Sequence, residues 1–115
     1  MFIDYADSNE DQLEVTLSGE MDAQGCSEIR PQLDRLLDDA QHKDVALDIG
    51  AVSFIDSSGI GAIVFLFKRL KARGGALSLY NVQGQPRELI ELLRIDTAIP
   101  VHFESALNAT REAGR

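Results

Sequence analysis

The chain has 115 residues and a mass of 12.6 kDa, which suits a single folded domain over residues 1–115 with a core of its own. Its 19 acidic and 11 basic residues give a formal net charge of −8, which argues against binding to nucleic acid phosphates. No apolar run is long enough to insert into a membrane, and the first residues lack the pattern of a secretory signal. We therefore expect a soluble cytoplasmic protein.

Two strands come first in chain order. Residues 13–18 alternate strictly between apolar and polar side chains, as a strand with one buried face does, and Gly19 follows them. Residues 2–5 show a weaker strand pattern. Because only a short polar stretch separates the two, they are expected to pair as an antiparallel hairpin.

The first helix is predicted from apolar residues at helical spacing before position 41. Pro31 lacks an amide hydrogen, so the regular helix is expected to begin near Ser27 or Glu28. Cys26 then lies in the entry turn. A lone cysteine excludes an internal disulfide and is most often a small core residue, whereas a reactive thiol would need a histidine partner. His42 and His102 lie far away in the sequence and show no metal-ligand spacing.

The remaining pattern alternates strands with helices. A strand ending in an apolar run is followed by a long amphipathic helix, and two further strand and helix pairs complete the chain. The predicted segments are a strand at 45–49, a helix at 57–73, a strand at 76–82, a helix opened by Pro86, an edge strand at 99–103 that contains Pro100, and a terminal helix at 105–112. Such alternation predicts an α/β sandwich with a mainly parallel sheet, the first hairpin excepted, and about four helices.

The glycines Gly59 and Gly61 do not form a phosphate-binding loop. Their spacing lacks the third glycine of a dinucleotide fingerprint and the Gly-Lys-Ser/Thr of a nucleotide triphosphate loop. Small residues where a helix leaves a sheet more often let the helix pack closely, and we expect that role for both.

A carboxylate cluster of Asp22, Asp48 and Asp56 could resemble the magnesium site of receiver domains. The paired acids and the lysine of that arrangement are missing, so Asp22 is expected to be a turn residue that bonds its own backbone. The sequence shows no base, nucleophile or metal set, and we expect neither a cofactor nor enzymatic activity.

The junction Asp56-Ser57-Ser58-Gly59 joins the apolar strand to the long helix. Serine and aspartate cap helices because their side-chain oxygens accept hydrogen bonds from first-turn amides, and the same amides attract phosphate. Capping by Asp56 or Ser57 is the commoner use of such residues, whereas a serine presented to a partner as a switch is the more specific alternative.

Phe65 departs from the pattern of this helix. The period of 3.6 places Ile60, Ile63, Val64, Phe67 and Leu70 on the core face. Phe65 projects nearly opposite, with Ala62 and Arg69 close in angle and Leu66 at the margin. A large apolar group on the solvent side is typical of a partner surface, although a second helix covering Phe65 explains it equally well.

Two segments together resemble the STAS domain of bacterial anti-sigma factor antagonists. These are Gly19-Glu20-Met21-Asp22 and, about thirty residues later, Val52-Ser53-Phe54-Ile55-Asp56-Ser57-Ser58-Gly59-Ile60-Gly61, in the order that the family has. The resemblance implies that Ser57 is the phosphoacceptor, that Ser58 is the unmodified second serine, and that Asp22 and Asp56 are the acidic residues near the site. Gln24 and Gly25 depart from the residues often found after the first aspartate.

The resemblance also implies partners. Such proteins bind an anti-sigma factor, often a serine kinase of GHKL type, and thereby free a sigma factor; phosphorylation ends the binding and a PPM-type phosphatase restores it. Similar domains also serve as accessory subunits of ABC-type lipid transport complexes, which is the alternative reading. A nucleotide-binding enzyme is disfavoured by the missing phosphate loop.

Overall fold

The computed structural model describes residues 1–40 and 44–104, which form a four-stranded sheet in the order β1-β2-β3-β4. The hairpin of the first two strands is antiparallel, and the other neighbours pair in parallel. The strands are β1 (Phe2–Asn9), β2 (Gln12–Met21), β3 (Asp44–Ile55) and β4 (Leu77–Tyr80). The predicted α/β fold with a mixed, mainly parallel sheet is confirmed.

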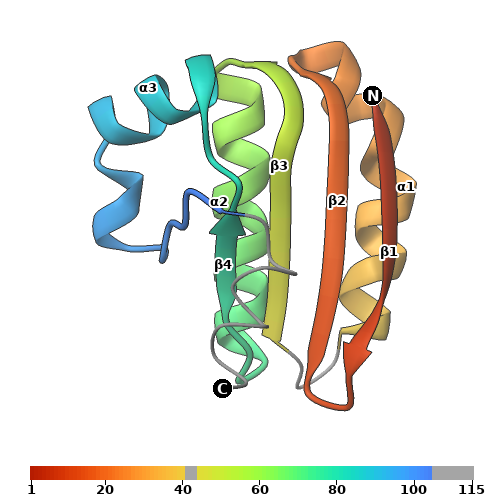
Figure 1. Ribbon diagram of the computed structural model, residues 1–115. Coiled ribbons are helices and arrows are strands. Elements are labelled where there is room, and N and C mark those ends of the chain that lie inside the picture. Colours follow the sequence, from red (N-terminus) through yellow and green to blue (C-terminus); the bar gives the residue numbers. More distant parts are fainter. Residues whose placement is uncertain (41–43, 105–115) are drawn as a thin grey trace.

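The two long helices α1 (Ala23–Asp39) and α2 (Ser57–Ala72) lie side by side on one face of the sheet (Figure 1). A shorter helix, α3 (Gly84–Leu92), and a 3-10 turn (Ile95–Thr97) follow β4. The alternation along β2 places its apolar side chains on this face. Val15 and Leu17, each between polar neighbours, are fully buried beneath the helices. The terminal helix predicted at 105–112 lies outside the described residues.

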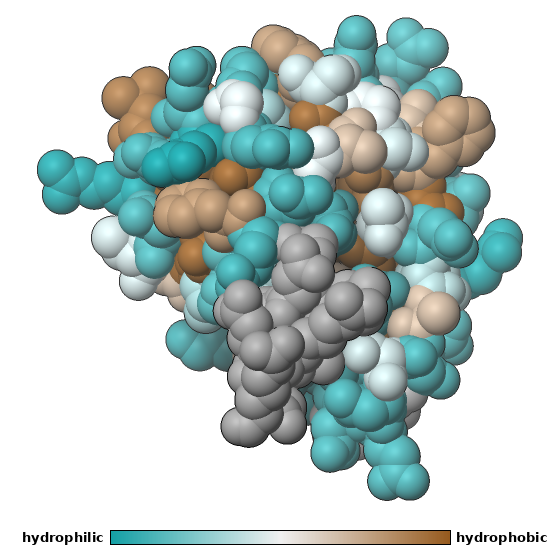
Figure 2. Space-filling view, viewed as in Figure 1, coloured by the Kyte–Doolittle hydropathy of each residue, from teal (hydrophilic) through white to brown (hydrophobic). Residues whose placement is uncertain are grey.

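Figure 2 shows the molecule from the side of the sheet opposite α1 and α2. On the surface visible there, hydrophobic side chains form separate areas among hydrophilic ones. The large hydrophobic residues most exposed in the described part of the chain are Phe2, Phe54, Leu92, Leu93 and Phe103. Three of these belong to the segment from α3 onwards. Phe2 is the first residue of the edge strand β1, and Phe54 is the last residue but one of β3.

The predicted start of the first helix is wrong. The helix begins at Ala23, and Pro31 lies inside it on an exposed side. A proline in a helix interior removes one hydrogen bond, but the cap supplied by Asp22 and the buried stripe of α1 hold the first turns in place. Cys26 is therefore in the first turn of the helix and not in an entry turn.

Three of the later segments also differ from their predicted bounds. The strand predicted at 76–82 is only four residues long, because Asn81 adopts a left-handed conformation with φ of 57°. The strand predicted at 99–103 is reduced to one parallel bridge between Leu79 and Val101. The helix predicted to open at Pro86 begins two residues earlier, at Gly84, so the proline lies in its first turn, where its missing amide hydrogen costs nothing.

Candidate functional site

Asp22 and Asp56 lie at the same edge of the sheet. Each directly follows a parallel strand, and the last residues of those strands, Met21 of β2 and Ile55 of β3, are register partners. Because the carboxyl ends of neighbouring parallel strands meet at one edge, two helices start there side by side. The N-terminal ends of α1 and α2 therefore share one surface.

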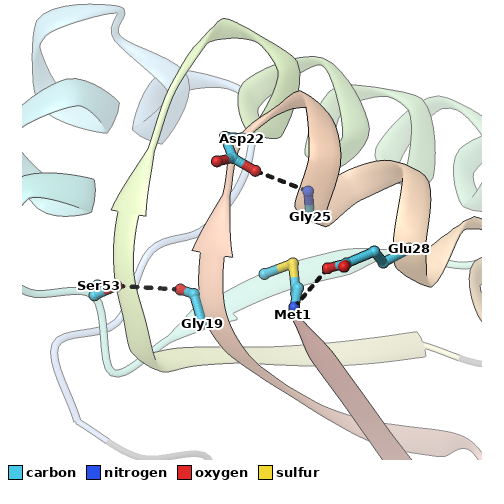
Figure 3. Close-up of polar contacts among 6 residues, drawn as sticks. All are labelled: Met1, Gly19, Asp22, Gly25, Glu28 and Ser53. Carbon is cyan, nitrogen blue, oxygen red and sulfur yellow. Dashed lines mark hydrogen bonds and ion pairs between the residues drawn. The ribbon is translucent and has the colours of Figure 1, made fainter.

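Both aspartates cap a helix. An Asp56 Oδ1 atom accepts hydrogen bonds from the Ser58 and Gly59 amides at 2.8 and 3.2 Å. The Asp22 Oδ1 atom accepts one from the Gly25 amide at 2.7 Å (Figure 3). The capping interpretation of the junction is thus confirmed for Asp56, and Asp22 bonds nearby backbone as expected. Each carboxylate already satisfies amides that a helix start leaves unpaired.

Other contacts hold this edge together. Figure 3 shows the Met1 amino group beside Glu28 of α1, with a nitrogen to oxygen distance of 2.8 Å. The Ser53 hydroxyl lies 3.5 Å from the Gly19 carbonyl oxygen, which links β3 to β2. From the other side, the Gln85 side-chain amide of α3 pairs with both backbone groups of Ile55 at 2.8 Å. The end of β3 before α2 is therefore tied to β2 by Ser53 and to α3 by Gln85.

Ser57 is the first residue of α2 and is exposed. Within the described residues its hydroxyl has no hydrogen-bond partner, since Asp56 supplies the cap. Ser58 is half-buried and faces the neighbouring helix α1. The two serines thus differ in access: Ser57 is presented to solvent, and Ser58 lies at the start of a groove.

The two glycines of this helix have different roles. A β-carbon on Gly59 would lie 2.5 Å from the Ile55 Cγ1 atom and 2.5 Å from the Met21 carbonyl oxygen, so only glycine lets α2 start this close to the sheet. The close-packing role is confirmed for Gly59. For Gly61 it is wrong, because a β-carbon there would meet no atom within 4 Å and the residue is exposed.

A groove of about 380 Å³ runs between the first halves of α1 and α2. Its α2 side is formed by Ser58, Gly61, Ala62 and Phe65. Phe65 is half-buried in this groove, and the Arg69 guanidinium lies 5.1 Å from the centre of its ring. The neighbouring helix therefore covers Phe65 in part and leaves the rest of its ring open to the groove.

Leu66 was expected at the margin of the exposed face, and that prediction is wrong. Leu66 is buried, with 2% of its surface accessible, in a stripe with Ile63 and Leu70. Since α2 packs on α1 as well as on the sheet, its buried face is turned toward Leu66. The side chains of Ile60, Val64 and Phe67 are correspondingly only half-buried. Leu66 cannot offer its side chain to a partner in this fold.

The α1 side of the groove was not anticipated from the sequence. It is formed mainly by Ala23, Cys26, Ser27, Arg30 and Asp34. Ala23, Ser27, Arg30 and Asp34 recur at helical spacing on one side of α1, which is the signal that could have found them. Their pairing with α2 is a tertiary relation that neither helix shows alone.

The sequence offers four further candidates for catalysis or metal binding: Cys26, Asp48, His42 and His102. Burial raises the pKa of the half-buried Cys26 thiol, and the carboxylates of Asp56 and Asp22 raise it further. The Asp48 carboxylate binds the Gly50 amide at 2.9 Å on β3, and the described residues bring together no group of three metal-binding side chains. The His102 ring stacks on Tyr80 with 4.4 Å between ring centres, and His42 lies outside the described residues.

The STAS domain family matches residues 5–109, which is most of the chain. The chain belongs to this family. An anti-sigma-B factor antagonist of Bacillus subtilis is 30% identical over 97 residues, which cover 84% of this chain and 87% of that protein. An anti-sigma F factor antagonist of Paenibacillus polymyxa is 28% identical over 98 residues, covering 85% and 83%. The resemblance noted from the two sequence segments is therefore confirmed.

Solved structures share the STAS fold at lower identity. An anti-sigma-factor antagonist domain protein from Planctomyces limnophilus superposes with a TM-score of 0.81 at 19% identity, covering 98% of both chains. The Bacillus cell fate determinant SpoIIAA in its phosphorylated form superposes with a TM-score of 0.72 at 18% identity, covering 99% of this chain and 100% of SpoIIAA. In the described part of this chain, no helix has both the length and the apolar character needed to cross a bilayer.

Proposed function

We propose that this protein is an anti-sigma factor antagonist whose binding is switched by phosphorylation of Ser57. The unmodified protein binds an anti-sigma factor that is also a serine kinase of GHKL type, and thereby frees a sigma factor. The observation that carries the proposal is the geometry of Ser57: an exposed hydroxyl at the first residue of α2, with no partner of its own among the described residues, beside an aspartate that already caps the helix.

Two comparisons support the proposal. The Bacillus and Paenibacillus relatives are named as anti-sigma factor antagonists, and SpoIIAA, which has the same fold, has been solved in a phosphorylated form. The Asp-Ser-Ser-Gly junction of this chain lies at the start of α2, where an incoming kinase can reach it. In this proposal Asp22, Asp56, Ser58 and Gly59 form the environment of the phosphorylation site.

The capping pattern suggests how the switch acts. The Ser58 and Gly59 amides, which could otherwise bind a phosphate, are already bound by the Asp56 carboxylate. A phosphate on Ser57 therefore stays in solvent beside the fixed charge of Asp56. We expect the fold to keep its conformation, because the phosphate displaces no existing hydrogen bond among the described residues. The cost appears when a partner covers the site, because a dianion must then lose water without a compensating donor.

The chain acts by binding and is not an enzyme in this proposal, and it needs no cofactor. A PPM-type phosphatase removes the phosphate and restores binding. Because the kinase partner uses ATP, we place the cycle in the cytoplasm. Direct contact with nucleic acid is not expected of a protein with a net charge of −8.

The deciding experiment is to isolate the protein from its own host, determine its intact mass and map the modified residue. The proposal expects a fraction carrying one phosphate on Ser57, and binding of the unmodified fraction alone to a purified anti-sigma factor of that host. Protein that carries no phosphoserine and copurifies with an ABC-type transporter ATPase would contradict the proposal and favour the lipid transport alternative.

A further inference from the structure

The groove between α1 and α2 has the features of a binding site for a side chain of a partner, and phosphorylation of Ser57 does not require such a groove. Its floor on the α2 side is Gly61, which has open space where a side chain would be. Its wall includes Phe65, an apolar side chain that the fold leaves only half-buried. A groove with a small floor and an aromatic wall accepts a large apolar side chain from outside.

The groove carries positive charge as well as negative charge. Arg30 lines it and Arg69 lies over the Phe65 ring; Asp34 is the carboxylate in its lining, and Asp22 and Asp56 lie near the Cys26 thiol at its Ser58 end. Neither guanidinium forms an ion pair with a carboxylate among the residues that the structure describes. Two unpaired arginines beside an apolar groove are suited to a partner that brings an acidic group.

The groove is continuous with the site of modification. Ser58, which follows Ser57 directly, forms its first part, and the Cys26 thiol in its wall is close enough to Asp22 and Asp56 for both carboxylates to raise its pKa. A segment that fills the groove therefore reaches Ser58, the residue next to Ser57. Phosphorylation would place negative charge next to a segment that is itself acidic.

From these observations we infer that the groove between α1 and α2 seats a segment of the anti-sigma factor that carries a large apolar side chain next to an acidic one. The apolar side chain packs on Gly61 and Phe65, and the acidic group pairs with Arg30 and Arg69. This inference rests on the proposed function and adds to it the α1 half of the interface and the chemistry of the partner's segment.

Gly61→Leu tests the apolar part. A β-carbon at this position meets no atom of the protein within 4 Å, and helix propensity favours leucine over glycine, so the variant is expected to fold with its side chain occupying the groove. Binding should weaken about tenfold or more, the effect typical of a residue at the centre of an interface. Ala72→Leu is the matched control: it places the same side chain at an exposed position at the end of α2, outside the groove, and should bind as the wild type does.

Arg30→Glu combined with Arg69→Glu tests the charged part. We expect about tenfold weaker binding at low salt and a smaller difference at high salt, since the interaction is electrostatic. Lys68→Glu with Lys71→Glu changes the net charge by the same amount on exposed positions that do not line the groove. This control should bind nearly as well as the wild type.

The single cysteine supplies a second readout. The probes are the purified GHKL-type anti-sigma kinases of the host, mixed with a thiol reagent, and modification of Cys26 is followed by mass spectrometry. A bound kinase should slow modification of Cys26 in the wild type and in both controls, and should not do so in Gly61→Leu. Modification in denaturant, where the groove is absent, gives the reference rate.

The outcomes separate the two claims. If none of the kinases binds the wild type, the proposed function is overturned and the groove inference with it. If the wild type binds and Ser57→Asp does not, while Gly61→Leu and the double arginine variant bind as tightly as the wild type and Cys26 is not protected, the groove inference alone is overturned. A groove filled by a second copy of the chain would overturn it too, and would show as a dimer that Gly61→Leu dissociates.

Discussion

Asp22 and Asp56 cap two neighbouring helices from the ends of two neighbouring parallel strands, so both carboxylates lie at the edge of the sheet where α2 begins with the exposed Ser57. Each aspartate is held in place by amides of its own helix, which fixes where its charge lies. The positions of the two carboxylates thus follow from the pairing of Met21 with Ile55 at the ends of β2 and β3.

Asp56 can be tested as a cap and as a charge separately. Asp56→Ala loses the hydrogen bonds to the Ser58 and Gly59 amides and should cost about 0.5–2 kcal/mol of the free energy of unfolding. Asp56→Asn keeps a good cap and removes only the charge, so its stability should stay near that of the wild type while phosphorylation by the partner kinase slows. Urea unfolding and kinase assays on the two variants measure the two effects.

The chemistry of the phosphate provides the control for this assignment. A serine ester survives alkaline hydroxylamine, whereas an acyl phosphate on Asp22 or Asp56 is lost rapidly. Retention of the label in hydroxylamine is the expected result. Rapid loss from the wild type, with no loss of labelling in Ser57→Ala, would show that an aspartate takes the phosphate.

Gly59→Ala and Gly61→Ala form a matched pair on one helix. The new methyl group at position 59 would overlap with atoms of Ile55 and Met21, and overpacking of this kind costs about 1–3 kcal/mol. The methyl group at position 61 meets nothing, and replacing glycine inside a helix should gain about 0.5–1 kcal/mol. Equal changes in the midpoint of urea unfolding for the two variants would show that α2 does not pack closely on the sheet at Gly59.

Local patterns in the sequence were sufficient to predict the hairpin, the parallel sheet and the capped junction, because strand alternation and capping depend on neighbouring residues. Leu66 and the start of α1 were predicted wrongly for a different reason. Helix periodicity locates a buried stripe but not how far it turns when a second helix packs beside the first. The groove between residues 23–34 and 58–65 could not be predicted, since it exists only once both helices lie on the sheet.

Leu66→Ala and Phe65→Glu should affect different properties. Truncating the fully buried Leu66 should cost about 2–5 kcal/mol of the free energy of unfolding. Phe65 is half-buried and open to the groove, so a glutamate at this position can reach water, and the variant should remain folded while partner binding weakens. Thermal unfolding beside a binding assay separates them, and a well-folded Phe65→Glu protein that binds normally would remove Phe65 from the interface.

Cys26 should make the protein less stable at alkaline pH. Since burial and two carboxylates raise the pKa of its thiol in the folded state, the unfolded chain loses the proton first as pH rises. Stability should therefore be unaffected well below the ordinary thiol pKa of about 8.5 and should fall above it, until the folded thiol also ionises. Unfolding measured from pH 7 to 10 checks this, with Cys26→Ala as the reference that should lack this part of the decline.

Phosphorylation of Ser57 should switch binding without unfolding the domain. The added phosphate carries about −1.5 to −2 charges, and the dipole of α2 offsets only about 0.3–1 kcal/mol of its cost at an exposed site. A net cost of about 4 kcal/mol at the partner interface would weaken binding about a thousandfold. We expect Ser57→Ala to bind constitutively, Ser57→Asp to bind weakly, and Ser58→Ala still to accept phosphate. Calorimetry with the anti-sigma factor measures these affinities, and undiminished binding of authentic Ser57-phosphorylated protein would defeat the switch.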